Sequence, residues 1–263
     1  MKTKNKRSLI TIISYTVCLV FLVVGSITLL STFKEKEKVN SSIKADKVIQ
    51  SKVGPKLTKE VKSKDIPNLN WDEINSISPN IVAWITIPGT KINYPILHGS
   101  DNDFYLKHDY NGNRDELGSL FIDYRQLDDF SPLNTFIYGH NVLIDSVDTK
   151  FTELNGYLDQ DFYSKHKNVI IYTPEKVIHG KIFAAHSDTS DSQSNTKSFN
   201  TVEDFNTYKT FMKKVSDIKS DQDVDSVKQL VTLWTCTMKS GVSTNGEPFS
   251  KDESRTFVSV AID

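Results

Sequence analysis

The sequence predicts a mainly β protein with helical insertions: a barrel or sandwich of eight short strands, preceded by a short helical region and one transmembrane helix. Three observations carry this prediction. Eight β-prone runs lie between residues 81 and 262, a helix-like spacing of apolar residues comes before them, and a long uncharged segment lies near the start. The 263 residues suffice for one large domain or two smaller ones, and the two cysteines exclude a disulfide-stapled mini-fold.

The uncharged segment at Leu9–Leu30 has the length of a membrane span. Its 22 residues would extend about 33 Å as a helix, against a hydrocarbon core of about 30 Å. The rival interpretation is a cleaved signal peptide, whose apolar region is usually about 7–15 residues long and ends in a small-x-small site. Residues 31–33 (STF) offer no convincing site, so we expect an uncleaved signal anchor.

Charges beside this segment predict its orientation. Residues 1–8 carry three lysines and Arg7, and the positive-inside tendency places this short end in the cytoplasm. We therefore expect a single-pass protein of the cell membrane, with everything after the span extracytoplasmic.

The extracytoplasmic part divides into a stalk and a domain. Residues 31–67 are rich in Lys, Ser and Val and poor in large apolar side chains, so we expect an exposed stalk before a domain at 68–263. Residues 1–65 carry 14 Lys/Arg against 5 Asp/Glu, whereas the remaining 198 residues carry 18 against 28. Because nucleic-acid binding requires a basic surface, the acidic domain argues against that function.

The domain is expected to begin with a short helix at 71–77, where three apolar residues recur at three-residue spacing. Helical insertions are expected at 149–166 and at 201–219, the second with apolar residues at spacings of three and four. The eight β-prone runs are IVAWITI (81–87), INYPIL (92–97), SLFIDY (119–124), NTFIYGH (134–140), NVIIYT (168–173), VIHGKIFAAH (177–186), LVTLWTCT (230–237) and RTFVSVAI (255–262).

The predicted topology leaves one thiol in the extracytoplasmic part. Cys18 lies inside the expected span and cannot pair with Cys236, which is near the end of the run LVTLWTCT. An unpaired cysteine in an oxidising compartment is either buried and inert or reactive. Composition alone favours the inert alternative.

Two further residues at the ends of β-prone runs could act together with Cys236 in catalysis. His140 ends the run TFIYGH, and Arg255 opens the last run. In cysteine acyl transfer a thiolate attacks a carbonyl, an imidazole transfers protons and a guanidinium stabilises oxyanion charge. Because separation along the sequence does not establish contact, the residues alone make this set a hypothesis.

Three segments around these residues resemble the signature segments of sortases, the membrane-anchored cysteine transpeptidases of Gram-positive bacteria. They are YGHN at 138–141, TLWTC at 232–236 and R-x-x-V-x-V-A at 255–261. The resemblance covers about residues 70–263 and implies an eight-stranded β-barrel. Class B is indicated by the helical pattern at 201–219 and by PNIVAWITI (79–87), INYPIL (92–97), DNDFYL (101–106) and GSLFIDYR (118–125).

The resemblance implies roles for individual residues of the catalytic set. Cys236 becomes the nucleophile and His140 the acid and base, while Arg255 stabilises the oxyanion or holds substrate carbonyls. Asn102 and Leu106 match positions that line the groove for the sorting signal, although Asn102 has the alternative of capping a turn with its own side chain.

This chain also departs from the family pattern near the thiol. Trp234 stands where class B members often have Ser, so we expect a narrower or more apolar pocket, lined by Trp234 and Thr235. Residues 237–254 form a longer connection than usual and are a candidate flap. The polar run HSDTSDSQSNTKS, between residues 185 and 199, does not match the family's substrate-contacting pattern, so no residue there is assigned a role.

The resemblance implies cleavage of a sorting signal similar to NPxTN or NPxTG after Thr, through a thioacyl intermediate. The expected partners are secreted proteins with that signal, a lipid-linked peptidoglycan precursor that supplies an amine, and the membrane around the N-terminal helix. No cofactor is implied, and His98 and His108 lack a third ligand at a clear spacing, so we expect no metal. The alternative function is an inactive or hydrolysis-only sortase-like surface domain.

Overall fold

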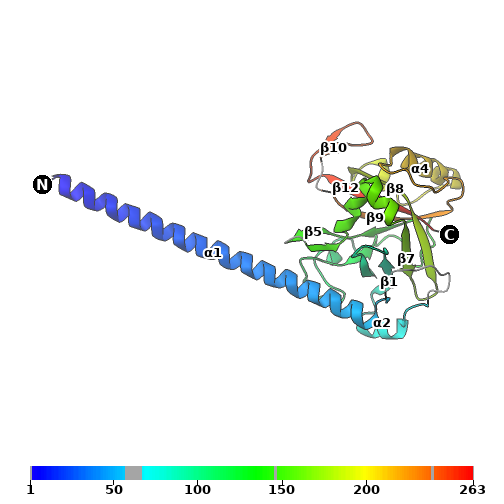
Figure 1. The fold of residues 1–263 in the computed structure, drawn as a ribbon, viewed down its shortest axis with the longest axis horizontal. Coiled ribbons are helices and arrows are strands. Elements are labelled where there is room, and N and C mark those ends of the chain that lie inside the picture. Colours follow the sequence, from blue (N-terminus) through cyan, green and yellow to red (C-terminus); the bar gives the residue numbers. More distant parts are fainter. Residues whose placement is uncertain (1, 57–66, 145–146, 238–239, 263) are drawn as a thin grey trace.

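The computed structural model describes residues 2–56, 67–144, 147–237 and 240–262, with side chains described except at 2–14, 16, 18, 35 and 142–148. A long helix leads into a β domain that smaller helices surround (Figure 1). The helical elements are α1 (Lys2–Val53), α2 (Trp71–Ile77), η1 (Phe104–Leu106), η2 (Thr152–Leu158), α3 (Gln160–Lys165), η3 (Gln193–Asn195) and α4 (Val202–Val215). The strands are β1 (Ile81–Thr86), β2 (Asn93–His98), β3 (Leu120–Ile122), β4 (Asn134–Tyr138), β5 (Asn141–Ile144), β6 (Val147–Lys150), β7 (Asn168–Tyr172), β8 (Val177–Thr189), β9 (Gln229–Cys236), β10 (Gly241–Val242), β11 (Pro248–Phe249) and β12 (Ser254–Ile262).

Eight strands close into a barrel in the order β1-β2-β3-β4-β9-β12-β8-β7, which confirms the predicted eight-stranded architecture. The β2–β3 and β4–β9 pairs are parallel, and the other pairs are antiparallel. Closure pairs every strand on both sides, so the barrel has no free sheet edge. The smaller hairpins β5–β6 and β10–β11 stand outside the barrel and were not predicted.

Alternate residues of the strands pack into two separate apolar clusters. On β9, Val231 and Leu233 belong to one cluster, and Leu230 and Trp234 belong to the other. The second cluster also contains side chains from α1, α2 and α4, so it lies on the outer face of the barrel. This alternation follows from the two-residue period of a strand.

The predicted helix at 71–77 is present, and the Asn70 side chain accepts a hydrogen bond from the third helical N–H. The insertion expected at 201–219 is α4, whose start is fixed by a capping box between Thr201 and Asp204. The expectation of a helix at 149–166 differs in part from the structure. There the chain first completes β6, then forms the 3-10 helix η2 and the short helix α3.

The N-terminal helix α1 contains the segment expected to span a membrane, although the side chains of residues 9–14, 16 and 18 lie outside those described. Within the described part of the chain, no helix combines the length and the apolar character that a membrane crossing requires. The exposed stalk expected at 31–67 differs from the structure over its described part. Helix α1 continues to Val53, and Ser42, Asp46, Ile49 and Val53 are buried. Their spacing of three and four residues forms one stripe against the barrel.

Candidate active site

Strands β4 and β9 end, and strand β12 begins, at the same end of the barrel. In the parallel pair β4–β9, Tyr138 is in register with Trp234, and the Gly139 N–H donates to the Trp234 carbonyl over 3.1 Å. In the antiparallel pair β9–β12, Cys236 lies opposite Arg255. Continuing the first register by two residues puts His140 beside Cys236. The topology therefore brings the three predicted catalytic residues to one end of the barrel.

Cys236 lies on the outer face of the barrel. Trp234 belongs to the outer cluster, and the two-residue period places Cys236 on the same side of β9. The Trp234 ring meets Tyr138 edge-on at 5.1 Å and Phe257 edge-on at 6.5 Å between ring centroids. These aromatic side chains form an apolar wall next to Cys236.

His140 is half-buried and oriented by a single backbone contact. Its Nε2 lies 2.7 Å from the carbonyl oxygen of Leu106, at the end of η1. A carbonyl only accepts hydrogen bonds, so Nε2 carries the proton and donates it. This leaves Nδ1 as the nitrogen that can exchange a proton with a substrate. Leu106 therefore takes part in the site through its carbonyl oxygen. This contact fixes the tautomer of His140.

Cys236 is a free, half-buried thiol whose backbone is held by two amide side chains. Asn141 Nδ2 donates to the Cys236 carbonyl over 2.9 Å, and Asn155 Nδ2 donates to the same oxygen over 3.4 Å. Asn155 Oδ1 in turn accepts the hydroxyl of Thr256 on β12 over 2.5 Å. Neither asparagine was predicted from the sequence, although Asn141 stands within YGHN.

Arg255 extends its guanidinium across the wall of the site. Its Cζ lies 5.2 Å from the centroid of the Trp234 ring, a favourable cation–π geometry. Nη1 donates to the carbonyls of Asp252 and Ser254 over 2.9 and 2.8 Å. Nε is buried and has no hydrogen-bond partner within the described part of the chain. Because Nε is buried, an incoming oxygen cannot reach it in this conformation.

Two residues predicted to line the substrate pocket make internal contacts. Thr235 is fully buried, and its hydroxyl donates to the Gly139 carbonyl over 2.7 Å, which ties the strand of Cys236 to the segment of His140. Asn102 Nδ2 donates to Asp123 over 3.2 Å, and its Oδ1 accepts the N–H of Tyr124 over 3.1 Å. Both side chains therefore brace the site, and contact with substrate stays a prediction for each of them.

Asp123 is the centre of a polar network beneath the loop that supports His140. Arg125 donates to it through Nε and Nη2 over 2.8 and 2.7 Å, and the Tyr138 hydroxyl donates over 2.8 Å. Burial alone would raise the pKa of the Asp123 carboxyl, but these hydrogen bonds outweigh burial and hold that pKa well below its usual range. Asp123 is therefore an ionised anchor that fixes Asn102 and the segment that leads to Leu106.

Comparison with known proteins assigns this geometry to a family. No family model matches the sequence. The chain is 35% identical to Sortase B of Listeria monocytogenes over 164 residues, which are 62% of the chain and 65% of that protein. It is 32% identical to Sortase B of Staphylococcus aureus over 166 residues, which are 63% of the chain and 67% of that protein. The chain belongs to the sortase B family.

Solved structures support the same assignment. The crystal structure of S. aureus sortase B superposes with a TM-score of 0.66 and 26% identity, covering 87% of this chain and 98% of that one. In sequence, the match spans just under two thirds of the length of the Listeria relative. The predicted class B sortase fold is therefore confirmed for the barrel and its helices.

The candidate flap of this class B sortase is attached to β8 by one carboxylate. Asp188 lies opposite Arg255 in the β8–β12 pair, and it accepts the backbone N–H of Thr244 over 3.1 Å and the hydroxyl of Thr244 over 2.6 Å. Burial would raise the pKa of Asp188, but hydrogen bonds from Thr244 and Ser194 lower it. Because Thr244 belongs to the connection at 237–254, Asp188 fixes that connection beside the catalytic edge.

Within the described residues, no group of three His, Cys, Asp or Glu side chains is arranged to hold a metal ion. His98 pairs with Asp128 at 3.4 Å, and His108 stacks on Phe104 with ring centroids 3.9 Å apart. The groups that the registers bring together at this end of the barrel are the Cys236 thiol, the His140 imidazole and the Arg255 guanidinium.

Proposed function

We propose that this sortase is a membrane-anchored cysteine transpeptidase that cleaves an NPxTN- or NPxTG-like sorting signal after Thr and joins the Thr carboxyl to an amine of a lipid-linked cell-wall precursor. The single observation that carries the proposal is the arrangement of His140, Cys236 and Arg255 on three neighbouring strands at one end of the barrel.

The first half-reaction forms a thioester. The Cys236 thiolate attacks the Thr carbonyl, and the electron pair of the C=O bond moves to oxygen. The positive charge of the Arg255 guanidinium stabilises the resulting oxyanion. As the tetrahedral intermediate collapses, the C–N bond breaks and His140 gives a proton to the leaving amine.

The second half-reaction transfers the acyl group. An acceptor amine attacks the thioester carbonyl, His140 takes a proton from that amine, and the C–S bond breaks to release the Cys236 thiolate. Atoms balance: one peptide bond is broken, one amide bond is formed and the enzyme is unchanged. Water in place of the amine gives hydrolysis, which is the alternative function.

Two solved structures of related proteins agree with a two-substrate reaction. One is a sortase B complexed with triglycine, which is 26% identical to this chain with a TM-score of 0.65. The other is an S. aureus sortase B–substrate complex, which is 25% identical with a TM-score of 0.64. We extend to this chain a peptide substrate and an amine acceptor of that kind.

The membrane location is part of the same proposal. Residues 9–30 would anchor the protein in the membrane, with the barrel outside the cell. A tether confines the enzyme to a thin layer, and that raises its effective concentration towards substrates held in the same membrane. A secreted protein retained by its own hydrophobic tail and a lipid-linked precursor would both lie in that layer.

A peptide panel tests the proposed specificity. The full chain in detergent is incubated with peptides that contain NPxTN, NPxTG or a scrambled sequence, with and without triglycine, and products are identified by mass. The proposal expects cleavage after Thr only in the signal peptides and a Thr–triglycine product when the amine is present. Cleavage with no amine product at any triglycine concentration would support the hydrolysis-only alternative, and no cleavage would support the inactive one.

A further inference from the structure

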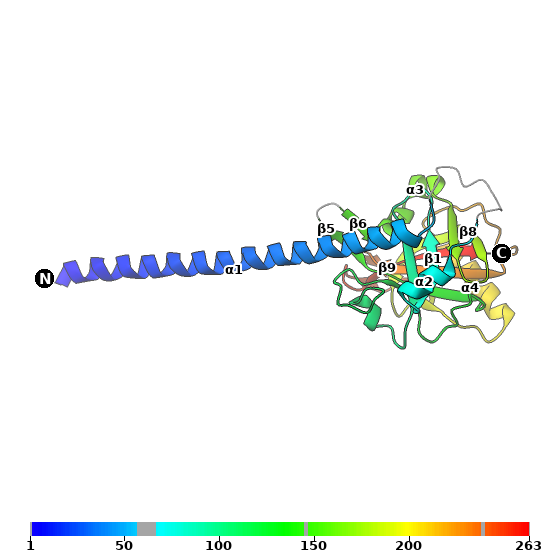
Figure 2. The same ribbon diagram turned by 90° about the horizontal axis from the view of Figure 1, so that it is seen from below.

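The last turns of α1 are joined to the barrel domain by a buried ion pair. Lys150 Nζ lies 2.7 Å from both carboxylate oxygens of Asp46, and their side chains are 4% and 11% exposed. Lys150 is the last residue of β6, so the pair connects the N-terminal helix to the β5–β6 hairpin. In both overall views the hairpin lies beside the C-terminal half of α1 (Figures 1 and 2).

Lys150 is held in an unusual conformation for this contact. Its φ is 50°, in the left-handed region that residues other than glycine rarely adopt. Its ammonium also lies 5.0 Å from the centroid of the Tyr94 ring on β2. Such a conformation persists only where the surroundings fix it. The Asp46 carboxylate and the Tyr94 ring supply those surroundings.

The ionised form of the buried Asp46 side chain depends on the Lys150 ammonium. Burial raises the pKa of Asp46, the charge of Lys150 lowers it, and the nearby Asp109 and Asp115 raise it further. A buried charge that loses its partner is strongly unfavourable. Asp46 and Lys150 are therefore held together as a unit, and displacement of one residue displaces the other.

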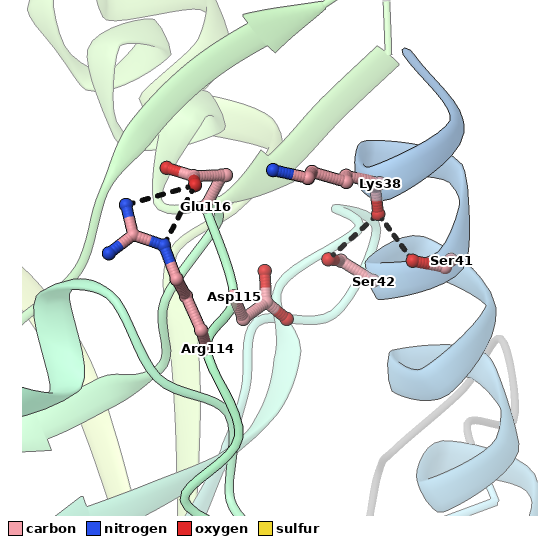
Figure 3. Close-up of a pocket in the computed structure, with 6 residues that line it drawn as sticks. All are labelled: Lys38, Ser41, Ser42, Arg114, Asp115 and Glu116. Atoms are coloured by element: carbon pink, nitrogen blue, oxygen red, sulfur yellow. Dashed lines mark hydrogen bonds and ion pairs between the residues drawn. The ribbon is translucent and has the colours of Figure 1, made fainter. Parts of the chain in front are cut away.

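The contacts of α1 on the two sides of this pair differ in character. One turn towards the N-terminus, helix α1 and the loop before β3 enclose a polar cavity of about 170 Å³ (Figure 3). One turn towards the C-terminus, Ile49 and Val53 are buried and Gln50 donates to the Asn93 carbonyl over 2.7 Å. The ion pair thus lies at the boundary between the polar cavity on its N-terminal side and the packed contact of α1 on its C-terminal side. The cavity is lined by Lys38, Ser41, Ser42, Arg114, Asp115 and Glu116.

The hairpin that ends in Lys150 begins beside the catalytic residues. Asn141 lies opposite Lys150 in the β5–β6 register, and the N–H of Phe151 donates to the His140 carbonyl over 3.0 Å. Asn141 also donates to the Cys236 carbonyl over 2.9 Å. The base of one hairpin therefore connects Asp46 to the backbones of both His140 and Cys236.

We propose that Asp46 is a positioning residue of the active site: by holding Lys150, it fixes the β5–β6 hairpin and thereby the register of His140 with Cys236. Helix α1 is then part of the catalytic unit as well as the tether. The kinetic consequence of this inference rests on the proposed function. A misplacement of about 1 Å between reacting groups costs up to about 100-fold in rate.

The test uses the full chain in detergent with Asp46→Asn, Asp46→Glu and, as a control, Glu37→Gln at an exposed position of the same helix. Peptide cleavage is measured at a temperature at which circular dichroism shows each variant to be folded. We expect Asp46→Asn to lower kcat by about 10- to 100-fold with KM changed less than about twofold. Asp46→Glu should recover most of the loss, and Glu37→Gln should change nothing.

A second measurement separates this inference from the proposed function. The rate at which iodoacetamide alkylates Cys236 is followed against pH in the wild type and in Asp46→Asn. We expect the alkylation rate to differ between the variant and the wild type across this pH range, because displacement of His140 changes the surroundings of the thiol. An unchanged profile together with an unchanged kcat in folded Asp46→Asn would overturn the inference. If the wild type cleaves no peptide, the proposed function fails and the alkylation profile alone decides about Asp46.

Discussion

Cys236 and Arg255 lie directly opposite each other on the adjacent antiparallel strands β9 and β12. Side chains in opposed positions project from the same face of a sheet, so this register places the guanidinium on the side of the thiol. Arg255 also lies over Trp234, two residues before Cys236 on β9. The barrel therefore sets the side on which Arg255 and Cys236 project, and the Asp252 carbonyl in the connection before β12 helps to hold the guanidinium.

Replacement of Cys236 by Ala should abolish peptide cleavage and leave the fold intact. The side chain is half-buried at a strand end, and its removal opens no large cavity. Turnover of a sorting-signal peptide and the circular dichroism spectrum check the two parts of this prediction. Cys18→Ser is the matched control and should retain full activity. Residual cleavage by the Cys236→Ala protein above background would show that another group is the nucleophile.

His140→Gln should lower kcat by about 10²- to 10⁴-fold, the usual contribution of general acid–base catalysis. Glutamine keeps an N–H that can donate to the Leu106 carbonyl, so the local structure is preserved while proton transfer is lost. Steady-state kinetics on the same peptide provide the measurement, with His179→Gln at an exposed position of β8 as the control. Equal activity in the two variants would exclude His140 as the acid and base.

Arg255→Lys should lower kcat by about 10²-fold, although the charge is retained. Lysine has no planar group to stack on Trp234 and cannot reproduce the two hydrogen bonds from Nη1 to the backbone. The kinetics of Arg255→Lys are compared with those of Arg114→Lys, at an exposed position. Arg114→Lys should retain the wild-type kcat, which would show that the loss is specific to Arg255. Wild-type kcat in the Arg255→Lys enzyme would mean that only charge matters at this position.

His186 should make the folded state less stable as the pH falls. It is buried, stacks on Phe257 with ring centroids 5.6 Å apart, and burial lowers its pKa to about 4 despite the charge of Asp188. The unfolded chain, with an ordinary pKa of about 6.5, takes up the proton first. The free energy of unfolding should therefore fall by up to about 3 kcal/mol between about pH 6.5 and pH 4.

Urea unfolding across this pH range checks the prediction. His186→Gln should remove most of the pH dependence, whereas the exposed His179→Gln should retain it. Asp188 also has a lowered pKa, but its contribution is lost only at lower pH, below the ordinary value of 3.8. A slope that is the same in the wild type and in His186→Gln would assign the pH dependence to other groups.

Much of the barrel follows from local sequence, because strands and helices leave periodic patterns. The helix at 71–77 and the closing strands agree with their predicted positions, since the buried residues recur at the spacing that each element requires. The motifs around His140 and Cys236 also indicated which strand ends lie together, and the registers of β4, β9 and β12 place these residues at one end of the barrel; their catalytic roles stay a prediction.

Contacts between distant segments could not be predicted in the same way. The Asp46–Lys150 pair joins residues 104 positions apart, and Asn155 reaches Cys236 across 81 positions. The buried stripe of α1 did leave a signal in the three- and four-residue spacing of its members. The many Lys and Ser residues around these positions are typical of an exposed segment. Composition therefore outweighed spacing in the prediction of an exposed stalk.

Intact-protein mass spectrometry during turnover shows directly whether Cys236 carries the acyl group. When the full chain is mixed with a sorting-signal peptide, we expect an adduct on Cys236 with the mass of the N-terminal peptide fragment held as a thioester. Addition of triglycine should remove the adduct and yield the ligated peptide in equal amount. Cleavage or ligation of the peptide by a protein in which Cys236 never carries the acyl group would exclude the thioester mechanism.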